Sequence, residues 1–232
     1  MDERIVAKIS TGSKELDELL KGGYEKGVIT TIYGPAGSGK TNLCLMAISS
    51  FEEKKKIIYL DTEGSFSVDR FKQLTPKFEE IMNRLMFFHP TNFEEQKKFF
   101  EKIKSLLDDN IGLIVFDSVA MLYRLEIGKN NDVYNVNREL GIQIAYLSEV
   151  ARKKNIPVLV TNQVYSDFEN KDQVKMVGGD ILKYSSKCLI ELQKSTDLSV
   201  DTKRKLVLRK HRSLPDGKGF SYKIINEGII PQ

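Results

Sequence analysis

The chain has 232 residues, 29% of them charged, and a formal net charge of +4 at pH 7, a mild value that does not by itself indicate a nucleic-acid binder. This length suits one well-buried α/β core, and no linker, internal repeat or low-complexity stretch points to a second domain. No apolar run is long enough to cross a bilayer or to serve as a signal peptide, so we expect a soluble, cytoplasmic protein.

The first predicted element is a short helix near the N-terminus. Ser13 can cap it, Leu16 and Leu20 share one of its faces, and the glycines at 22–23 end it. An apolar run at 28–33 is typical of a buried strand, and residues 42–47 suit a helix. The intervening segment is therefore expected to turn from strand to helix.

This turn reads Gly-Pro-Ala-Gly-Ser-Gly-Lys-Thr, the pattern of a phosphate-binding loop. Its glycines let backbone N–H groups converge on phosphate oxygens at the positive end of a helix. Lys40 is expected to meet the β- and γ-phosphates of ATP, and Thr41 to ligate Mg²⁺. The alternative, a chance glycine-rich turn, is disfavoured by the flanking strand and helix. The predicted ATP-binding residues of this segment are Gly34, Pro35, Ala36, Gly37, Ser38, Gly39, Lys40, Thr41 and Asn42.

Short apolar runs then alternate with helical stretches along the chain. The runs are 57–60, 86–88, 113–116 and 158–160, and the main helical stretches are 92–107 and 133–154. This alternation predicts a parallel sheet covered by helices on both faces. After residue 187 the pattern changes to strands at 188–192, 206–208 and 220–225, with a hairpin turn at 215–218. We expect these strands to extend one edge of the sheet in antiparallel fashion.

Polar residues within three positions after three of the runs are candidates for chemistry, because ligands of such sheets bind at the carboxyl ends of the strands. Asp117 follows residues 113–116 and would place a carboxylate beside the Mg²⁺ held by Thr41, although it could instead cap the next element. Glu63 is the candidate to orient or deprotonate the attacking water, with a plain surface glutamate as the alternative. Gln163 could respond to the γ-phosphate, or could satisfy backbone groups.

These segments together resemble the core of the RecA/RadA recombinase family. The match runs over nearly the whole chain, through Ile9 to Gly23, the phosphate loop, Asp61-Thr62-Glu63-Gly64-Ser65-Phe66, Tyr123-Arg124, Thr161-Asn162-Gln163-Val164 and Gly178-Gly179-Asp180. The early position of the phosphate loop is similar to that of the short archaeal paralogue of RadA. The resemblance implies one RecA-like P-loop ATPase domain over 1–232, with Glu63 as catalytic carboxylate, Gln163 as γ-phosphate sensor and Arg70 stacking on adenine.

Two departures limit what the resemblance implies. Full-length relatives carry an N-terminal helical DNA-binding domain and a linker with a Phe-x-x-Ala hook for the next subunit, and neither precedes this core. We therefore expect no long filament and no strand exchange. Lys210 stands where relatives have an aspartate that reaches a neighbouring subunit's ATP, so it is a candidate ATP-cap residue, with a solvated basic strand as the alternative.

The family also suggests DNA contacts in two loops, at 124–138 and 165–179. The candidate contacts are Arg124, Lys129, Lys171 and Lys175. Acidic residues in both loops weaken this electrostatic signal, and the acid-free stretch 202–215 is a further candidate surface.

The function implied is an accessory role in DNA repair and homologous recombination. The protein would bind ATP, Mg²⁺ and DNA, single-stranded or branched, would hydrolyse ATP weakly, and would assist a RadA-type recombinase or a Holliday junction nuclease. The alternative from another class is a KaiC-like signalling ATPase that does not bind DNA.

Overall fold

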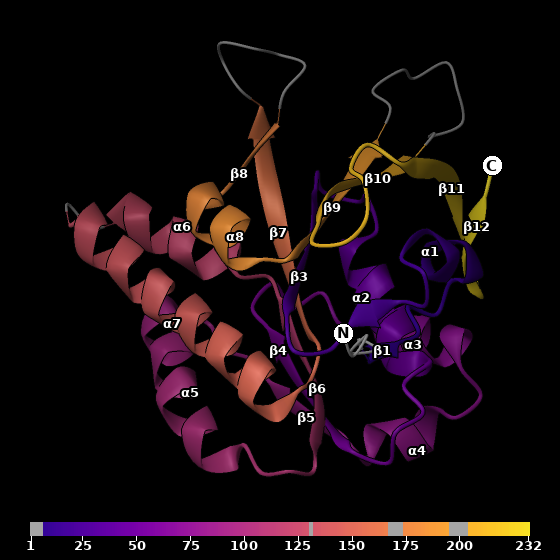
Figure 1. Cartoon of the computed structure of the whole chain (residues 1–232). Helices are drawn as coiled ribbons and strands as arrows, with labels where there is room; N and C mark the ends of the chain where they lie inside the picture. Colours follow the sequence, from indigo (N-terminus) through magenta and orange to yellow (C-terminus); the bar gives the residue numbers. More distant parts are fainter. Residues whose placement is uncertain (1–6, 130–131, 167–173, 195–203) are drawn as a thin grey trace, which may run out of the picture.

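The structure is a computed structural model that describes residues 7–129, 132–166, 174–194 and 204–232. Its centre is a mostly parallel sheet (Figure 1). From the middle to one edge, parallel strands follow in the order β3 (Ile29–Gly34), β7 (Val158–Ser166), β6 (Ile111–Asp117), β4 (Lys56–Asp61) and β5 (Leu85–Phe88). Strands with apolar residues on both sides fit this buried position.

The other half of the sheet is the antiparallel extension that the sequence predicts. On the far side of β3 lies β9 (Cys188–Lys194), still parallel to it, and antiparallel pairing then continues through β10 (Arg204–His211), β11 (Gly219–Ile225) and β12 (Gly228–Pro231). A short strand β8 (Val174–Met176) pairs with the end of β7, and β1 (Lys8–Ile9) pairs with β2 (Tyr24–Glu25). The predicted fold class is therefore confirmed.

Helices cover both faces of the sheet (Figure 1). One face carries α1 (Lys14–Leu19), α2 (Lys40–Ser49), α3 (Val68–Leu74) and α4 (Phe78–Met82). The other carries α5 (Phe93–Leu106), α6 (Ala120–Lys129), α7 (Val133–Lys154) and α8 (Gly179–Ser185). Strand β4 supplies both cores, since Ile57 and Tyr59 belong to the first apolar cluster and Ile58 and Leu60 to the second.

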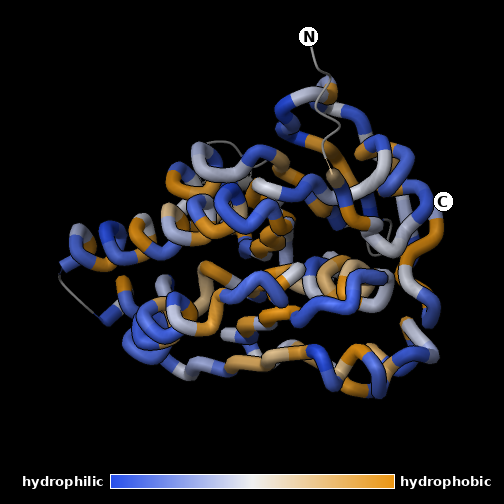
Figure 2. The backbone as a smooth tube through the Cα atoms, turned by 60° about the horizontal axis from the view of Figure 1, so that its bottom comes forward, coloured by the Kyte–Doolittle hydropathy of each residue, from blue (hydrophilic) through white to orange (hydrophobic). Residues whose placement is uncertain are grey.

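Hydrophilic and hydrophobic residues alternate along the outer helices in Figure 2, as expected for helices that bury one face. The caps follow the sequence closely. Ser13 accepts a hydrogen bond from the Leu16 N–H, and Asn92 accepts one from the Glu95 N–H at 2.9 Å. In the described ranges, no helix is both long enough and apolar enough to cross a membrane.

The first predicted DNA loop differs from expectation. Residues 124–129 continue α6 and residues 133–138 begin α7, so Arg124 and Arg138 lie on helices. The apolar residues in this part of the chain explain the difference, because Leu122 and Val136 are buried in the same core and draw both helices onto the sheet.

Because β3, β7, β6 and β4 run parallel, their carboxyl ends lie side by side along the same end of the sheet. In the strand register Gly34 of β3 lies opposite Gln163 of β7, and Asp61 of β4 lies opposite Asp117 of β6. Residues far apart in sequence are thereby brought to the start of α2.

Candidate functional site

The phosphate loop joins β3 to α2, and α2 begins at Lys40. Gly37 and Gly39 have φ values of +71° and +105°, a left-handed region that other residues adopt at a cost. Gly34 is required for space, because a Cβ there would lie 2.3 Å from the Leu192 carbonyl oxygen. The sequence thus folds into a bend that only these glycines permit.

A pocket of about 390 Å³ opens beside this loop. Nine predicted site residues line it: Ala36, Gly37, Gly39, Lys40, Thr41, Asn42, Glu63, Arg70 and Gln163. Leu45, Ser65, Ser67 and Ile224 complete the lining, and the sequence analysis missed them. The predicted residues Gly34, Pro35 and Ser38 shape the loop from outside this lining.

Lys40 folds back onto its own loop. Its Nζ donates hydrogen bonds to the carbonyl oxygens of Gly34 and Pro35, both at 3.0 Å. Burial lowers the pKa of the Lys40 ammonium, and the neighbouring Glu63 and Asp117 carboxylates oppose this by raising it. An ammonium surrounded by carbonyl dipoles at the floor of the pocket is well placed to meet an anion.

Asp117 lies beneath Thr41 and Ser65 and is almost completely buried. Its Oδ2 accepts hydrogen bonds from the Tyr59 hydroxyl at 2.9 Å and from the Ser65 hydroxyl at 3.2 Å, and its Oδ1 accepts one from Thr161. Burial raises the pKa of the Asp117 carboxyl, while the hydroxyl donors lower it.

The surroundings of Asp117 fit a magnesium ion that keeps several water ligands. The Thr41 hydroxyl lies 3.2 Å from the Ser65 hydroxyl that donates to Asp117. Among the described residues, no cluster of three or more His, Cys, Asp or Glu side chains could hold a metal. Mg²⁺ typically needs only one or two protein ligands when substrate phosphates complete its shell, so Thr41 and Asp117 suffice.

The two residues predicted to act at the γ-phosphate touch each other. Gln163 Nε2 donates a hydrogen bond to Glu63 Oε1 at 2.9 Å. The turn that carries Glu63 is fixed by buried Asp61, whose carboxylate accepts hydrogen bonds from the backbone N–H groups of Glu63 (3.1 Å), Ser65 (3.2 Å) and Phe66 (3.0 Å). The sequence analysis missed this role of Asp61, although an aspartate at a strand end followed by a glycine-containing turn is a usable signal.

Arg70 connects α2 to the turn between β11 and β12. Its Nε donates to Asn42 Oδ1 at 2.8 Å, and its terminal nitrogens donate to the carbonyl oxygens of Ile225 at 2.7 Å and Asn226 at 2.9 Å. Burial lowers the pKa of this guanidinium, and Glu227 opposes the shift. Stacking of Arg70 on adenine stays a prediction.

The remaining predicted residues do not gather at this pocket. Arg124 and Lys129 are exposed on α6, Lys175 lies on β8, and Lys171 is outside the described residues. Lys210 donates to the carbonyl oxygen of Lys183 at 2.7 Å. At the other end of β10, Arg204 Nε donates to the Gly37 carbonyl oxygen of the phosphate loop at 3.3 Å. Lys210 lies six residues along the strand from Arg204, a separation of about 20 Å at the usual rise of a strand. A cap role for Lys210 would therefore concern another subunit's nucleotide.

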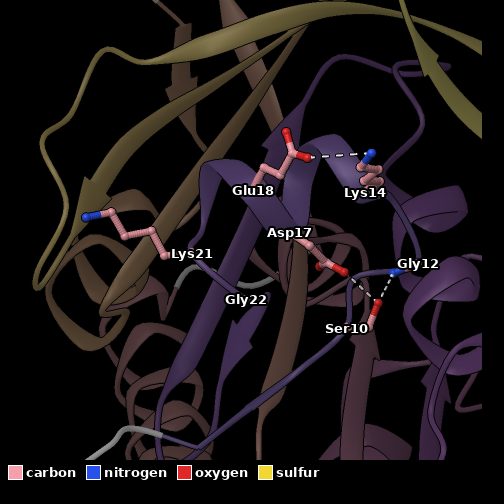
Figure 3. A pocket seen from close by; sticks show the side chains of 7 residues that line it. All are labelled: Ser10, Gly12, Lys14, Asp17, Glu18, Lys21 and Gly22. Atoms are coloured by element: carbon pink, nitrogen blue, oxygen red, sulfur yellow. Dashed lines mark hydrogen bonds and ion pairs between the residues drawn. The ribbon is translucent and has the colours of Figure 1, made fainter.

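A different hollow lies against α1 (Figure 3). Its polar groups pair with one another: the Ser10 hydroxyl donates to Asp17 at 2.7 Å and accepts from the Gly12 N–H at 3.1 Å. A Cβ on Gly12 would lie 2.6 Å from the Met46 carbonyl oxygen, so this turn packs tightly on α2. The polar groups of this hollow therefore hold a turn that packs against α2, the helix that follows the phosphate loop.

This chain is similar to known proteins over nearly its whole length. The family model described as Rad51 matches residues 2–232. The chain belongs to the Rad51 family. Members of this RecA-like family are nucleotide-binding ATPases, and the predicted resemblance and fold are confirmed.

Similar proteins include several named DNA repair and recombination protein RadB. The one from Methanobrevibacter smithii is 42% identical over 230 residues, covering 96% of this chain and 95% of the relative. The one from Methanococcoides burtonii is 40% identical over 227 residues, covering 97% and 98%. A solved structure, described as the crystal structure of the RadB recombinase, superposes with a TM-score of 0.78 at 36% identity and covers 95% of this chain and 98% of its own.

Proposed function

We propose that this protein acts in DNA repair and recombination as an ATP- and Mg²⁺-binding accessory protein with weak ATPase activity. The observation that carries the proposal is the contact between Gln163 and Glu63 at the mouth of a pocket floored by the phosphate loop. It joins a candidate base to a group that can respond to a terminal phosphate. Relatives named DNA repair and recombination protein RadB support the biological setting.

The residues of the pocket suit phosphoryl transfer to water. The amides of the loop and the Lys40 ammonium would hold the phosphates, and Arg70 would flank the base. Thr41 and Asp117 would hold Mg²⁺, which would supply positive charge to offset the charge that develops on the transferred phosphate. Glu63 would orient the attacking water and accept its proton. Gln163 would keep its hydrogen bond to Glu63 when no γ-phosphate is present and would give it up when one is bound.

Binding of DNA is part of the proposal. Exposed Arg124 and Lys129 on α6, together with Lys171 and Lys175, would contact phosphates of single-stranded or branched DNA. A RadA-type recombinase and a Holliday junction nuclease are the proposed partners. Turnover would be slow because Lys210 lies far from its own nucleotide pocket and would complete the pocket of a neighbouring subunit. The KaiC-like alternative receives no such support from the relatives.

The test combines nucleotide binding with hydrolysis. Calorimetry with Mg²⁺ and a nonhydrolysable ATP analogue should show binding to the wild type and to Glu63→Gln, and little or none to Lys40→Ala. Glu63→Gln should lower the hydrolysis rate about 10²-fold, the usual contribution of a general base. Fluorescence anisotropy with labelled single-stranded DNA tests the second activity. Absence of heat for the wild type would overturn the ATPase proposal, and absence of DNA binding would favour the signalling alternative.

A further inference from the structure

The antiparallel extension of the sheet contacts the phosphate loop through side chains of β10 and β11. The Tyr222 hydroxyl of β11 donates a hydrogen bond to the Ser38 carbonyl oxygen at 2.6 Å. Arg204 Nε of β10 donates to the Gly37 carbonyl oxygen at 3.3 Å. Two successive carbonyls of the loop are thus held by side chains from the C-terminal strands.

Because the peptide bond is planar, fixing the direction of a carbonyl also fixes the direction of the N–H that follows it. In a trans peptide the carbonyl oxygen and the following N–H point in opposite directions. With the Ser38 oxygen directed at Tyr222, the Gly39 N–H is directed away from it. Gly39 lines the nucleotide pocket, so this amide faces the space that phosphates would fill.

The surroundings of Tyr222 favour this hydrogen bond. Its side chain is fully buried, and burial raises the pKa of its phenol while Arg204 lowers it, so the hydroxyl stays protonated and donates. Two residues further along β11, Ile224 would lie 3.0 Å from a Cβ on Gly39, so the strand supports the loop by packing as well.

We propose that Tyr222 and Arg204 are positioning residues for nucleotide binding, which hold the Ser38 and Gly37 carbonyls so that the loop keeps its shape and the Gly39 amide faces the phosphates. This inference rests on the proposed ATP binding. It makes the C-terminal strands part of the nucleotide site, although only Ile224 among their residues lines the pocket. Neither residue lines the pocket, so we expect their effect to be on nucleotide affinity.

The main test is Tyr222→Phe, with Tyr24→Phe as a matched control. Tyr24 lies in the same apolar cluster and is equally buried, but within the described part of the chain its hydroxyl has no hydrogen-bond partner. Calorimetry with Mg²⁺ and the nonhydrolysable ATP analogue should show about three- to tenfold weaker binding for Tyr222→Phe, the loss expected for one hydrogen bond. Tyr24→Phe should bind as the wild type does. Thermal unfolding of both variants confirms that the proteins are folded.

Arg204→Gln gives a second measurement that does not depend on a core substitution. It should raise the KM for ATP by about two- to fivefold with little change in kcat, because a loop held for binding acts equally in ground and transition states. Lys205→Gln, the exposed neighbour on the same strand, loses the same charge and should leave KM unchanged.

The outcomes separate this inference from the proposed function. If the wild type does not bind the analogue, the ATPase proposal fails. If the wild type binds but Tyr222→Phe and Arg204→Gln bind equally well, the positioning role is overturned. Equal losses in Tyr222→Phe and Tyr24→Phe would assign Tyr222 to general core stability and would also overturn it.

Discussion

At the level of single residues, the proposed function of Asp117 and its burial favour opposite protonation states of its carboxyl group. Its proposed role in holding Mg²⁺ would need the carboxylate, yet burial favours the neutral acid and raises the pKa of Asp117 above the ordinary value of 3.8. A carboxyl whose pKa is raised on folding stabilises the protein at pH values below the unfolded pKa. That contribution is lost as pH rises through the folded pKa.

We therefore expect Asp117→Asn to unfold like the wild type near pH 4 and to be more stable at pH 7 without Mg²⁺, by about 1 kcal/mol, as is common for replaced functional charges. Denaturant unfolding of both proteins across this pH range measures the difference. Hydrolysis should be lost in the variant. A variant that is less stable at pH 7 than at pH 4, relative to the wild type, would contradict this account of Asp117.

Glu63 and Gln163 form a second residue-scale test, because their side chains are hydrogen-bonded. The rates of Glu63→Gln, Gln163→Ala and the double variant should be strongly non-additive, with the double variant close to Glu63→Gln alone. Single-turnover hydrolysis of ATP gives the three rates. Additive losses would mean that the two residues act independently.

At the scale of elements, the register of β11 against β10 determines where Tyr222 lies relative to the phosphate loop. A Cβ on Gly219 would lie 1.9 Å from the Leu206 carbonyl oxygen, a backbone atom that cannot move without displacing β10. The register of this hairpin thus depends on one glycine that the sequence analysis did not single out.

Gly219→Ala is expected to destabilise the protein by about 1–3 kcal/mol, the usual range of overpacked sites, and to weaken nucleotide binding. Gly141→Ala is the matched control, since Gly141 lies in the middle of α7 with open space around it. It should stabilise the protein by up to about 1 kcal/mol. Urea unfolding measures both, and a stabilised Gly219→Ala would refute the role of this close contact.

At the scale of the whole molecule, the two helical layers place possible DNA contacts on the side of the sheet opposite α2. Arg124 and Lys129 project from α6 on that face, and the net charge of +4 is modest. Any affinity for DNA should then come from a few phosphate contacts and fall steeply with salt.

Replacing Arg124 or Lys129 by Gln should lower the slope of log Kd against log salt by about one for each lost contact. Anisotropy titrations with single-stranded DNA at several salt concentrations provide the slope. Lys14→Gln, an equally exposed lysine on α1, should leave the slope unchanged. A salt-independent affinity would exclude a phosphate-tracking mode.

Much of this architecture is predictable from local patterns. The phosphate loop, the strand ends bearing Glu63, Asp117 and Gln163, the caps at Ser13 and Asn92, and the antiparallel extension all follow from signals within a few residues. The hydroxyls on Asp117 and the contacts of Arg70 were missed, since their partners come from other elements. The turn-fixing role of Asp61 was missed although its partners lie within five residues.

The amino-acid sequence by itself determined the fold class and most of the residues that line the pocket beside the phosphate loop, because glycine spacing, apolar periodicity and the polar residues that follow the strands act locally. Only the tertiary structure decided that Gln163 reaches Glu63, that α6 and α7 fill most of the first predicted DNA loop, and that Tyr222 and Arg204 hold the phosphate loop. These contacts join residues more than 90 positions apart or depend on how helices pack. Strand order and register, which pair distant segments of the chain, set such distances.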